Sequence, residues 1–174
     1  FFFFFYFRDV YEQSLSRLPF VSAQTNISKI EVWVTNKTRQ TIDVREMVAF
    51  QDIGEINKVF NPSILSGNTN PYPESNSNNL YNIITRSTDA QDFRDPARCI
   101  SFLEHHALQA VDDYEKVSAR KLASTEYTFN AQLGYISLNQ QLRPDEVLGV
   151  AIQYTVNGQV YQLGEFASDL PPLA

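Results

Sequence analysis

The pair Asn157-Gly158 constrains the fold of this chain more than any other short segment. It separates two runs in which apolar and polar residues alternate, and Asn-Gly is favoured in two-residue type I′ turns because both central positions need a positive φ. A two-residue turn also sets the register of the strands that it joins. We therefore expect an antiparallel hairpin over about residues 147–166. Its predicted facing pairs are Val156–Gln159, Tyr154–Tyr161 and Ile152–Leu163.

This register divides the side chains of the hairpin between an apolar face and a mixed face. The apolar face collects Leu148, Val150, Ile152, Tyr154, Tyr161 and Leu163. The mixed face collects Ala151, Gln153, Thr155, Val160 and Gln162. A lipid-facing strand needs an unbroken apolar face, usually with aromatic residues at both ends, but this hairpin ends in Glu165. A sheet packed on one side is the preferred interpretation, and a membrane strand is the alternative.

Three further local patterns predict an α+β fold with antiparallel sheets and short helices. The segment NAQLG separates two short β-like runs and predicts a second hairpin over about residues 127–138, with Gly134 in a left-handed conformation. Asp95-Pro96 is a typical helix start and predicts a helix over about residues 96–108. Its apolar stripe is Ile100, Leu103 and Ala107, broadened by Phe102. Three- and four-residue apolar spacing predicts another helix over about residues 6–18.

The middle of the chain carries weaker signals. Residues 27–36 alternate and predict a strand, and Trp33 on its polar side indicates that this second face is partly covered. Residues 42–50 are expected to return as a meander neighbour or bulged partner of that strand, and residues 80–86 look like a short strand. The segment 61–79 has three prolines, one glycine and six asparagines. It reads as a long surface loop or, alternatively, as a boundary between two subdomains.

Length and charge limit the class of protein. A chain of 174 residues fits one domain, here 1–174 with the irregular loop at about 61–79. A net charge of −6, with scattered basic residues, argues against nucleic-acid binding, because phosphate contacts need clustered Lys and Arg. The chain opens FFFFFYFRDV without Met and is expected to be a piece of a longer polypeptide. The opening run is a buried strand, a helix start or a contact with the parent protein.

The search for catalytic, cofactor or metal chemistry yields no candidate site. Adjacent side chains in a helix point about 100° apart, so His105-His106 is read as a polar helix end and not as a metal site. Cys99 lies beside the predicted buried stripe and is read as a structural thiol. The scattered glycines form no phosphate-binding loop. We therefore predict no catalytic residue, no cofactor, no metal ligand and no enzyme activity.

The aromatic residues of the two hairpins are the remaining candidates for function. They are interpreted as core and cross-strand pairs, and the alternative is an aromatic surface for a protein partner. The candidate interface residues are Tyr127, Tyr135, Tyr154 and Tyr161.

Long segments of the chain, in series, resemble the SprA (Sov) family of Bacteroidetes. The similar segments are YFRDVYEQSLSRLP, ISKIEVWVTNKTRQTIDVREMVAFQDIGE, ARKLASTEYTF, QLGYISLN and DEVLGVAIQYTVNGQVYQLGEF. The family comprises very large outer-membrane translocon proteins of the type IX secretion system, which also serves gliding motility in some members. The resemblance covers most of the chain except the segment 61–79.

The resemblance implies a role in passing folded cargo proteins across the outer membrane, without catalysis in this segment. The chain would be one non-catalytic structural domain of the translocon, inserted into or appended to a giant barrel, on a side of the membrane left open. Its partners would be the remainder of the parent barrel protein, with accessory envelope proteins and secreted cargo as further candidates. The alternative functions are a protein-binding module that recognises cargo or an accessory envelope protein, and an envelope enzyme.

Overall fold

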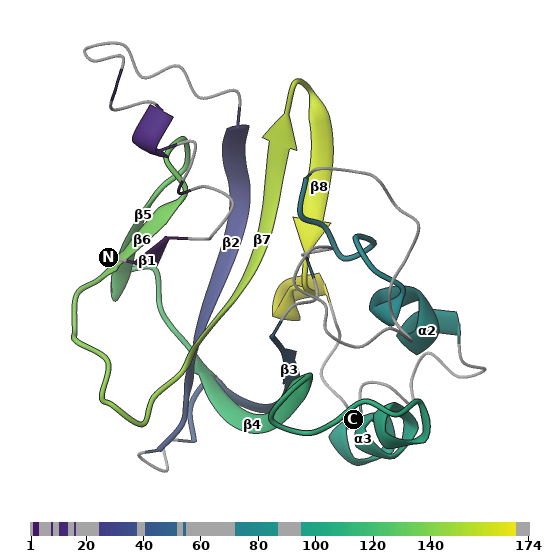
Figure 1. The fold of residues 1–174 in the computed structure, drawn as a ribbon. Helices are drawn as coiled ribbons and strands as arrows, with labels where there is room; N and C mark the ends of the chain where they lie inside the picture. The colour runs from purple at the N-terminus through teal and green to yellow at the C-terminus, as the bar shows by residue number, and fades with distance from the viewer. Residues whose placement is uncertain are drawn as a thin grey trace. The chain divides into compact units, whose positions relative to one another are not determined.

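The structure is a computed structural model of the chain. It describes residues 2–3, 8, 11–13, 16, 25–37, 41–51, 54, 72–86 and 95–169. The described strands and the helices α2 and α3 are labelled in Figure 1. In chain order the described elements are β1 (Phe2–Phe3), β2 (Thr25–Thr35), β3 (Val44–Phe50), α2 (Leu80–Arg86), α3 (Pro96–His105), β4 (Tyr114–Lys121), β5 (Tyr127–Asn130), β6 (Tyr135–Leu138), β7 (Leu148–Val156), β8 (Gln159–Leu163) and the 3-10 helix η4 (Ala167–Asp169).

The described strands form two antiparallel sheets. One sheet has three strands in the order β1-β6-β5, and the other has five in the order β3-β4-β2-β7-β8. Together with the two short helices they confirm the predicted α+β class.

The chain divides into two compact units where the sequence suggested one domain. The split unit consists of Phe1–Trp33 and Lys121–Ala174, and the inserted unit of Val34–Arg120. The division falls within β2 and within β4. It does not fall in the Asn/Pro-rich segment 61–79, which belongs to the inserted unit.

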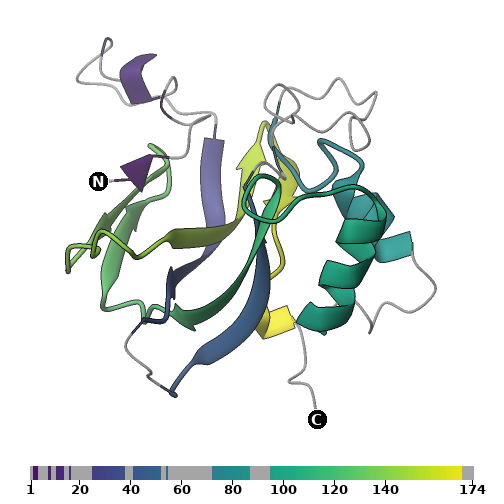
Figure 2. The same ribbon diagram turned by 60° about the horizontal axis from the view of Figure 1, so that its bottom comes forward.

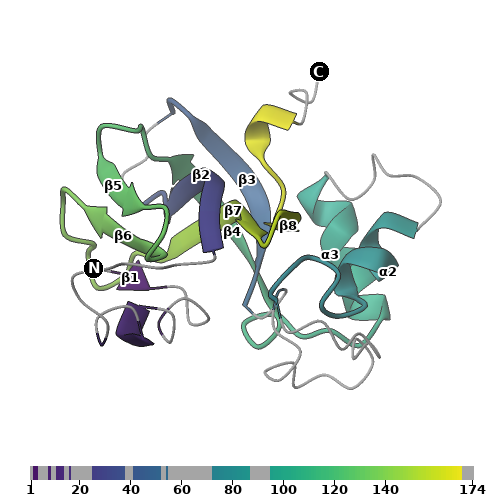
Figure 3. The same ribbon diagram turned by 90° about the horizontal axis from the view of Figure 1, so that it is seen from above.

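Both predicted hairpins are present in the split unit. In the β7–β8 hairpin the observed pairs include Val156↔Gln159, Tyr154↔Tyr161 and Ile152↔Leu163, as the turn predicted. Asn157 and Gly158 both have positive φ, 50° and 81°. In the β5–β6 hairpin Gly134 has φ 65° and donates its N–H to Asn130 at 3.0 Å. Figure 3 shows this hairpin next to β1, whose Phe2 pairs with Ile136.

Strand β2 is buried on both faces along its middle. Val32 is fully buried, while Glu31 and Trp33 on the opposite face are 4% and 8% exposed. Gly149 on β7 lies against Trp33, since a Cβ built at this glycine would be 3.9 Å from the Trp33 Cβ. The expectation that Trp33 marks a covered second face is therefore confirmed.

The predicted pairing of residues 42–50 is wrong. β3 pairs with β4, from Val44↔Arg120 to Phe50↔Tyr114, and β4 lies between β3 and β2. The sequence analysis did not predict β4, because Glu115, Lys116 and Ser118 interrupt its apolar residues. Without that strand, residues 42–50 had only the preceding strand as an apparent neighbour.

Residues 80–86 form helix α2 and not the predicted strand. The run Ile83-Ile84-Thr85 is β-branched, which favours a strand. However, Leu80 and Ile84, four residues apart, are the buried positions of the segment, as on one face of a helix. Ahead of the helix, the Asn78 side chain accepts the N–H of Leu80 at 3.0 Å. Packing of this face and the local cap together override the strand propensity.

Helix α3 begins where it was predicted and ends three residues early. The Asp95 side chain accepts the N–H of Ala97 at 2.9 Å, with Pro96 in the first turn. At the other end Ala107 takes φ 60°, and Leu108 donates its N–H back to Leu103 at 3.0 Å. Ala107 is consequently exposed and does not belong to the predicted buried stripe.

The core of the inserted unit lies between α2, α3 and strands β3 and β4 (Figure 2). Its buried residues are Leu80, Ile84, Cys99, Leu103, Leu108 and Tyr114. Val48 and Phe50 of β3 pack against this cluster.

Two predicted segments are described only in part. Of the helix expected over residues 6–18, residues 8 and 11–13 are helical and residue 16 is in a turn, while the other positions lie outside the described residues. Of the loop expected over 61–79, residues 61–71 lie outside them as well. The described end of this loop packs inward, because Ser77 and Asn78 are each only 1% exposed.

Candidate functional site

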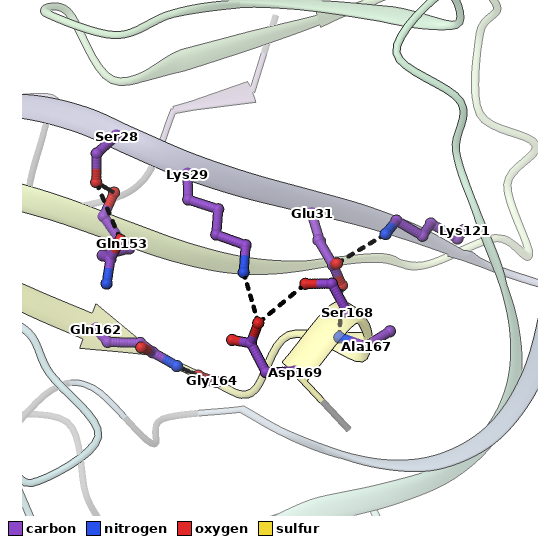
Figure 4. Close-up of polar contacts among 10 residues, drawn as sticks. All are labelled: Ser28, Lys29, Glu31, Lys121, Gln153, Gln162, Gly164, Ala167, Ser168 and Asp169. Carbon is purple, nitrogen blue, oxygen red and sulfur yellow. Dashed lines mark hydrogen bonds and ion pairs between the residues drawn. The ribbon is translucent and has the colours of Figure 1, made fainter. Parts of the chain in front are cut away.

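Within the split unit, a polar cluster holds η4 against β2. We call Lys29, Glu31, Lys121 and Asp169 the β2 clamp; Figure 4 shows their contacts. Glu31 lies at its centre and is 4% exposed. One carboxylate oxygen accepts from Lys121 Nζ at 2.7 Å, and the other accepts the N–H of Ala167 at 2.9 Å. This carboxylate therefore joins the end of β4 to the first residue of η4.

The contacts of Glu31 favour its charged form. Burial raises the pKa of the carboxyl, but the hydrogen bond from Lys121, the backbone bond from Ala167 and the positive charge of Lys121 together lower it below the ordinary value of 4.5. Hydrogen bonds to a carboxylate stabilise the ionised form in this way. Glu31 is thus a buried anion whose charge is matched inside the cluster.

The outer half of the clamp is more exposed. Lys29 Nζ donates to Asp169 Oδ1 at 2.9 Å and lies 4.1 Å from the centre of the Phe166 ring. The hydrogen bond from Lys29 is the main reason that the pKa of Asp169 is lowered. Phe166 itself is 1% exposed. Lys29 thus covers one buried aromatic ring and binds the carboxylate that ends η4.

The contacts of the clamp hold elements of the split unit together. Lys121 binds Glu31 and Lys29 binds Asp169. Glu31 also accepts a backbone N–H, and Asp169 also accepts the hydroxyl of Ser168 at 3.1 Å. Next to the clamp, Ser28 Oγ donates to the backbone oxygen of Gln153 at 3.1 Å, which links β2 to β7 (Figure 4). All these contacts fasten β2, β7 and η4 together.

The four tyrosines proposed as an interface do not share one exposed surface. Tyr154 is fully buried, and Tyr161 stacks on it across the β7–β8 pair with ring centres 5.5 Å apart. Tyr127 and Tyr135 are half-buried on the other sheet. The rings of Tyr135 and Tyr11 make a T-shaped contact, with ring centres 6.3 Å apart. Burial, with the charge of Glu31, raises the pKa of Tyr127. These contacts are those of core and cross-strand pairs; their use by a partner stays a prediction.

Cys99 is a poor nucleophile in this structure. It is 3% exposed, and burial raises its pKa to about 11. A thiol must lose its proton to attack a carbonyl or a disulfide, so this environment opposes reaction. Nearby, the buried Tyr114 hydroxyl has no hydrogen-bond partner among the described residues.

The adjacent histidines are arranged around the end of α3. His106 Nδ1 lies 2.9 Å from the Phe102 carbonyl oxygen and its ring packs on the Phe102 ring, while His105 is exposed. Within the described residues no three His, Cys, Asp or Glu side chains are grouped as metal ligands. Two acidic pairs of the sequence, Asp112-Asp113 and Asp145-Glu146, each supply a local acceptor: Asp113 accepts the N–H of Gln109, and Glu146 that of Arg143.

Strand β8 forms one edge of the five-stranded sheet, and no described strand lies on its other side. Val160 on this strand is 59% exposed. Its sequence QVYQL carries no charge and no proline.

The β2 clamp has no local sequence motif, because its contacts join residues far apart in the chain. Glu31 is 90 residues from Lys121 and 136 from Ala167. The available signal was a glutamate on the same strand face as Trp33, a face that the sequence predicts to be covered. A charged residue on a covered face requires a buried partner.

No helix among the described residues has the length and apolar character needed to cross a bilayer. Comparison of the chain with protein-family models and with curated proteins found no match.

Proposed function

We propose that this chain is a non-catalytic structural domain of an outer-membrane translocon of the type IX secretion and gliding-motility machinery, and that it supports protein export. The observation that carries the proposal is the serial resemblance to the SprA (Sov) family. Five long segments occur in the family's order and cover most of the chain outside 61–79.

The positions of these segments in the fold support the proposal. The segment 145–166 contains the whole β7–β8 hairpin, and the segment 27–55 contains most of β2 and all of β3. The segments 119–129 and 132–139 contain the end of β4 and most of the β5–β6 hairpin. Most of the similar segments therefore lie in strands of the two sheets. This is expected for a domain whose role is structural.

The contacts of the polar residues agree with a structural role. Glu31, the buried carboxylate of the β2 clamp, binds Lys121 and a backbone N–H, and Cys99 is buried in an apolar cluster. In each case the side chain is used to hold elements together. The proposed domain would act as a rigid support within the larger protein.

The test is made in a bacterium that encodes this chain. We would delete the codons for residues 1–174 in frame and measure secreted proteins in the medium by quantitative mass spectrometry. The expected result is loss of type IX cargo from the medium and its accumulation in the periplasm. Normal export by the deletion strain would refute the proposal.

A matched variant separates structural from catalytic roles. The triple replacement Cys99→Ala, His105→Ala and His106→Ala removes the candidate nucleophile and both imidazoles. We expect export to be unchanged if the variant protein reaches parental abundance in the outer-membrane fraction. An abundant, correctly located protein that fails to export cargo would favour the enzyme alternative.

A further inference from the structure

The register of the β7–β8 hairpin determines which backbone groups of β8 are available to a partner. The two-residue turn closes on the pair Val156–Gln159, so this pair, Tyr154–Tyr161 and Ile152–Leu163 exchange hydrogen bonds. The alternate residues Val160 and Gln162 direct their N–H and C=O groups away from β7. The outer edge of β8 therefore offers two donors and two acceptors in the spacing of an antiparallel strand.

The sequence of β8 lacks the features that usually protect an edge strand from pairing. Edge strands are commonly blunted by charged residues, proline, a bulge or very short length. β8 has five residues, none of them charged. At the other edge of the same sheet, β3 carries Arg45 and Glu46. The edge strands of the three-stranded sheet, β1 and β5, have only two and four residues.

We propose that β8 pairs in antiparallel fashion with β8 of a second copy of this chain, which joins two split units edge to edge. Only one register uses all the outward groups of both strands: Val160 faces Gln162 of the other copy, and Gln162 faces Val160. In this register the two strands form four hydrogen bonds related by a two-fold axis, because each of the two facing pairs exchanges two hydrogen bonds.

The side chains also fit this register. The two-fold axis passes between the two copies of Tyr161, each already stacked on its own Tyr154 with ring centres 5.5 Å apart. Pairing therefore extends the stack into a row of four tyrosines across four strands, a favourable cross-strand arrangement. The five residues of β8 carry no charge, so the pairing brings no like charges together. The strand is thus complementary to itself in hydrogen bonding and ring contacts.

The predicted dimer is weak. A stable interface buries roughly 1,600 Å² in total, more than one pair of five-residue strands provides. The association should therefore depend on concentration. We would measure it by sedimentation equilibrium of the full chain over a series of concentrations, and expect a monomer–dimer equilibrium. A chain that stays monomeric throughout would overturn the proposal.

The first pair of variants tests the backbone bonds. Val160→Pro removes an outward N–H and leaves the bonds to β7, since proline is tolerated where the N–H of an edge strand faces solvent. It removes two of the four intermolecular bonds, so dimerisation should weaken at least about tenfold. Val160→Thr keeps the N–H and should dimerise as the parent does. Equal dimerisation of both variants would contradict pairing through this edge.

The second pair tests the register without proline. Val160→Lys with Gln162→Lys places like charges opposite one another across the interface and should abolish the dimer. Val160→Lys with Gln162→Glu places opposite charges there and should retain it. Both positions are exposed, and both double variants lose the same Gln162 contact to Gly164. If the two double variants dimerise equally, the proposed register is wrong.

Discussion

Removing the Glu31 carboxylate is the sharpest test of how the split unit is held together. Glu31→Ala deletes the acceptor of two hydrogen bonds, from Lys121 Nζ and from the N–H of Ala167. A bond to a charged group contributes about 1.5–3 kcal/mol. The Lys121 side chain is 37% exposed, so its bond falls nearer the value of about 0–1 kcal/mol typical of exposed pairs. The two ranges add to a total loss of about 1.5–4 kcal/mol.

The assay is urea unfolding followed by tryptophan fluorescence. The chain has one tryptophan, Trp33, two residues from Glu31 on the same face of β2. Its emission therefore reports on the split unit around the clamp. With a mid-range denaturant slope of about 2 kcal/mol per molar urea, the midpoint should fall by roughly 1–2 M. The control is Glu165→Ala, which removes an exposed carboxylate from the same unit.

The pH dependence of the folding stability provides a second test of the Glu31 charge. The pKa of Glu31 is lower in the folded chain than its ordinary value of 4.5. Its contribution to stability is therefore complete above about pH 4.5 and is lost as pH falls through the folded pKa. Glu31→Gln has no proton to gain there, so its stability deficit at pH 7 should shrink at lower pH. A midpoint unchanged in Glu31→Ala, or a deficit of Glu31→Gln that does not shrink with pH, would refute the reasoning.

Two further predictions concern the glycines of the C-terminal hairpin region and the buried Cys99. Gly158 and Gly164 both have positive φ, but a Cβ at Gly158 meets nothing, whereas one at Gly164 lies 3.2 Å from the Ala151 Cβ. Gly158→Ala should therefore cost about 1–2 kcal/mol and Gly164→Ala more, and equal urea midpoints would contradict this. Cys99, buried and with a pKa of about 11, should react with an aromatic disulfide reagent at pH 8 only after unfolding in urea. Rapid reaction of the native chain would show that the thiol is accessible.

Local sequence predicted those parts of the fold that local chemistry determines. Asn157-Gly158 required two positive φ values, and the resulting register extended correctly along β7 and β8. Asp95-Pro96 likewise located the start of α3 because the cap and the first turn are made by neighbouring residues.

Contacts over long sequence separations explain the errors. Residues 80–86 have β-branched side chains, but the cluster around Leu103 buries Leu80 and Ile84 together and favours a helix. β4 has too few apolar residues to be recognised alone, and it becomes a strand by pairing with β3 on one side and β2 on the other. The partners of Glu31 could not be read from the sequence for the same reason. Nothing near Glu31 in the chain specifies Lys121 or Ala167.

The division of the chain has a consequence for the order in which its parts are completed during synthesis. The inserted unit is one continuous stretch, Val34–Arg120, so all its residues are available as soon as Arg120 leaves the ribosome. The first part of the split unit must wait, because Glu31 receives its partners only with Lys121 and then Ala167. Until then β2 carries an unmatched glutamate and an uncovered Trp33. During synthesis, residues of β2 are therefore made well before the β7–β8 hairpin that packs against them in the folded chain.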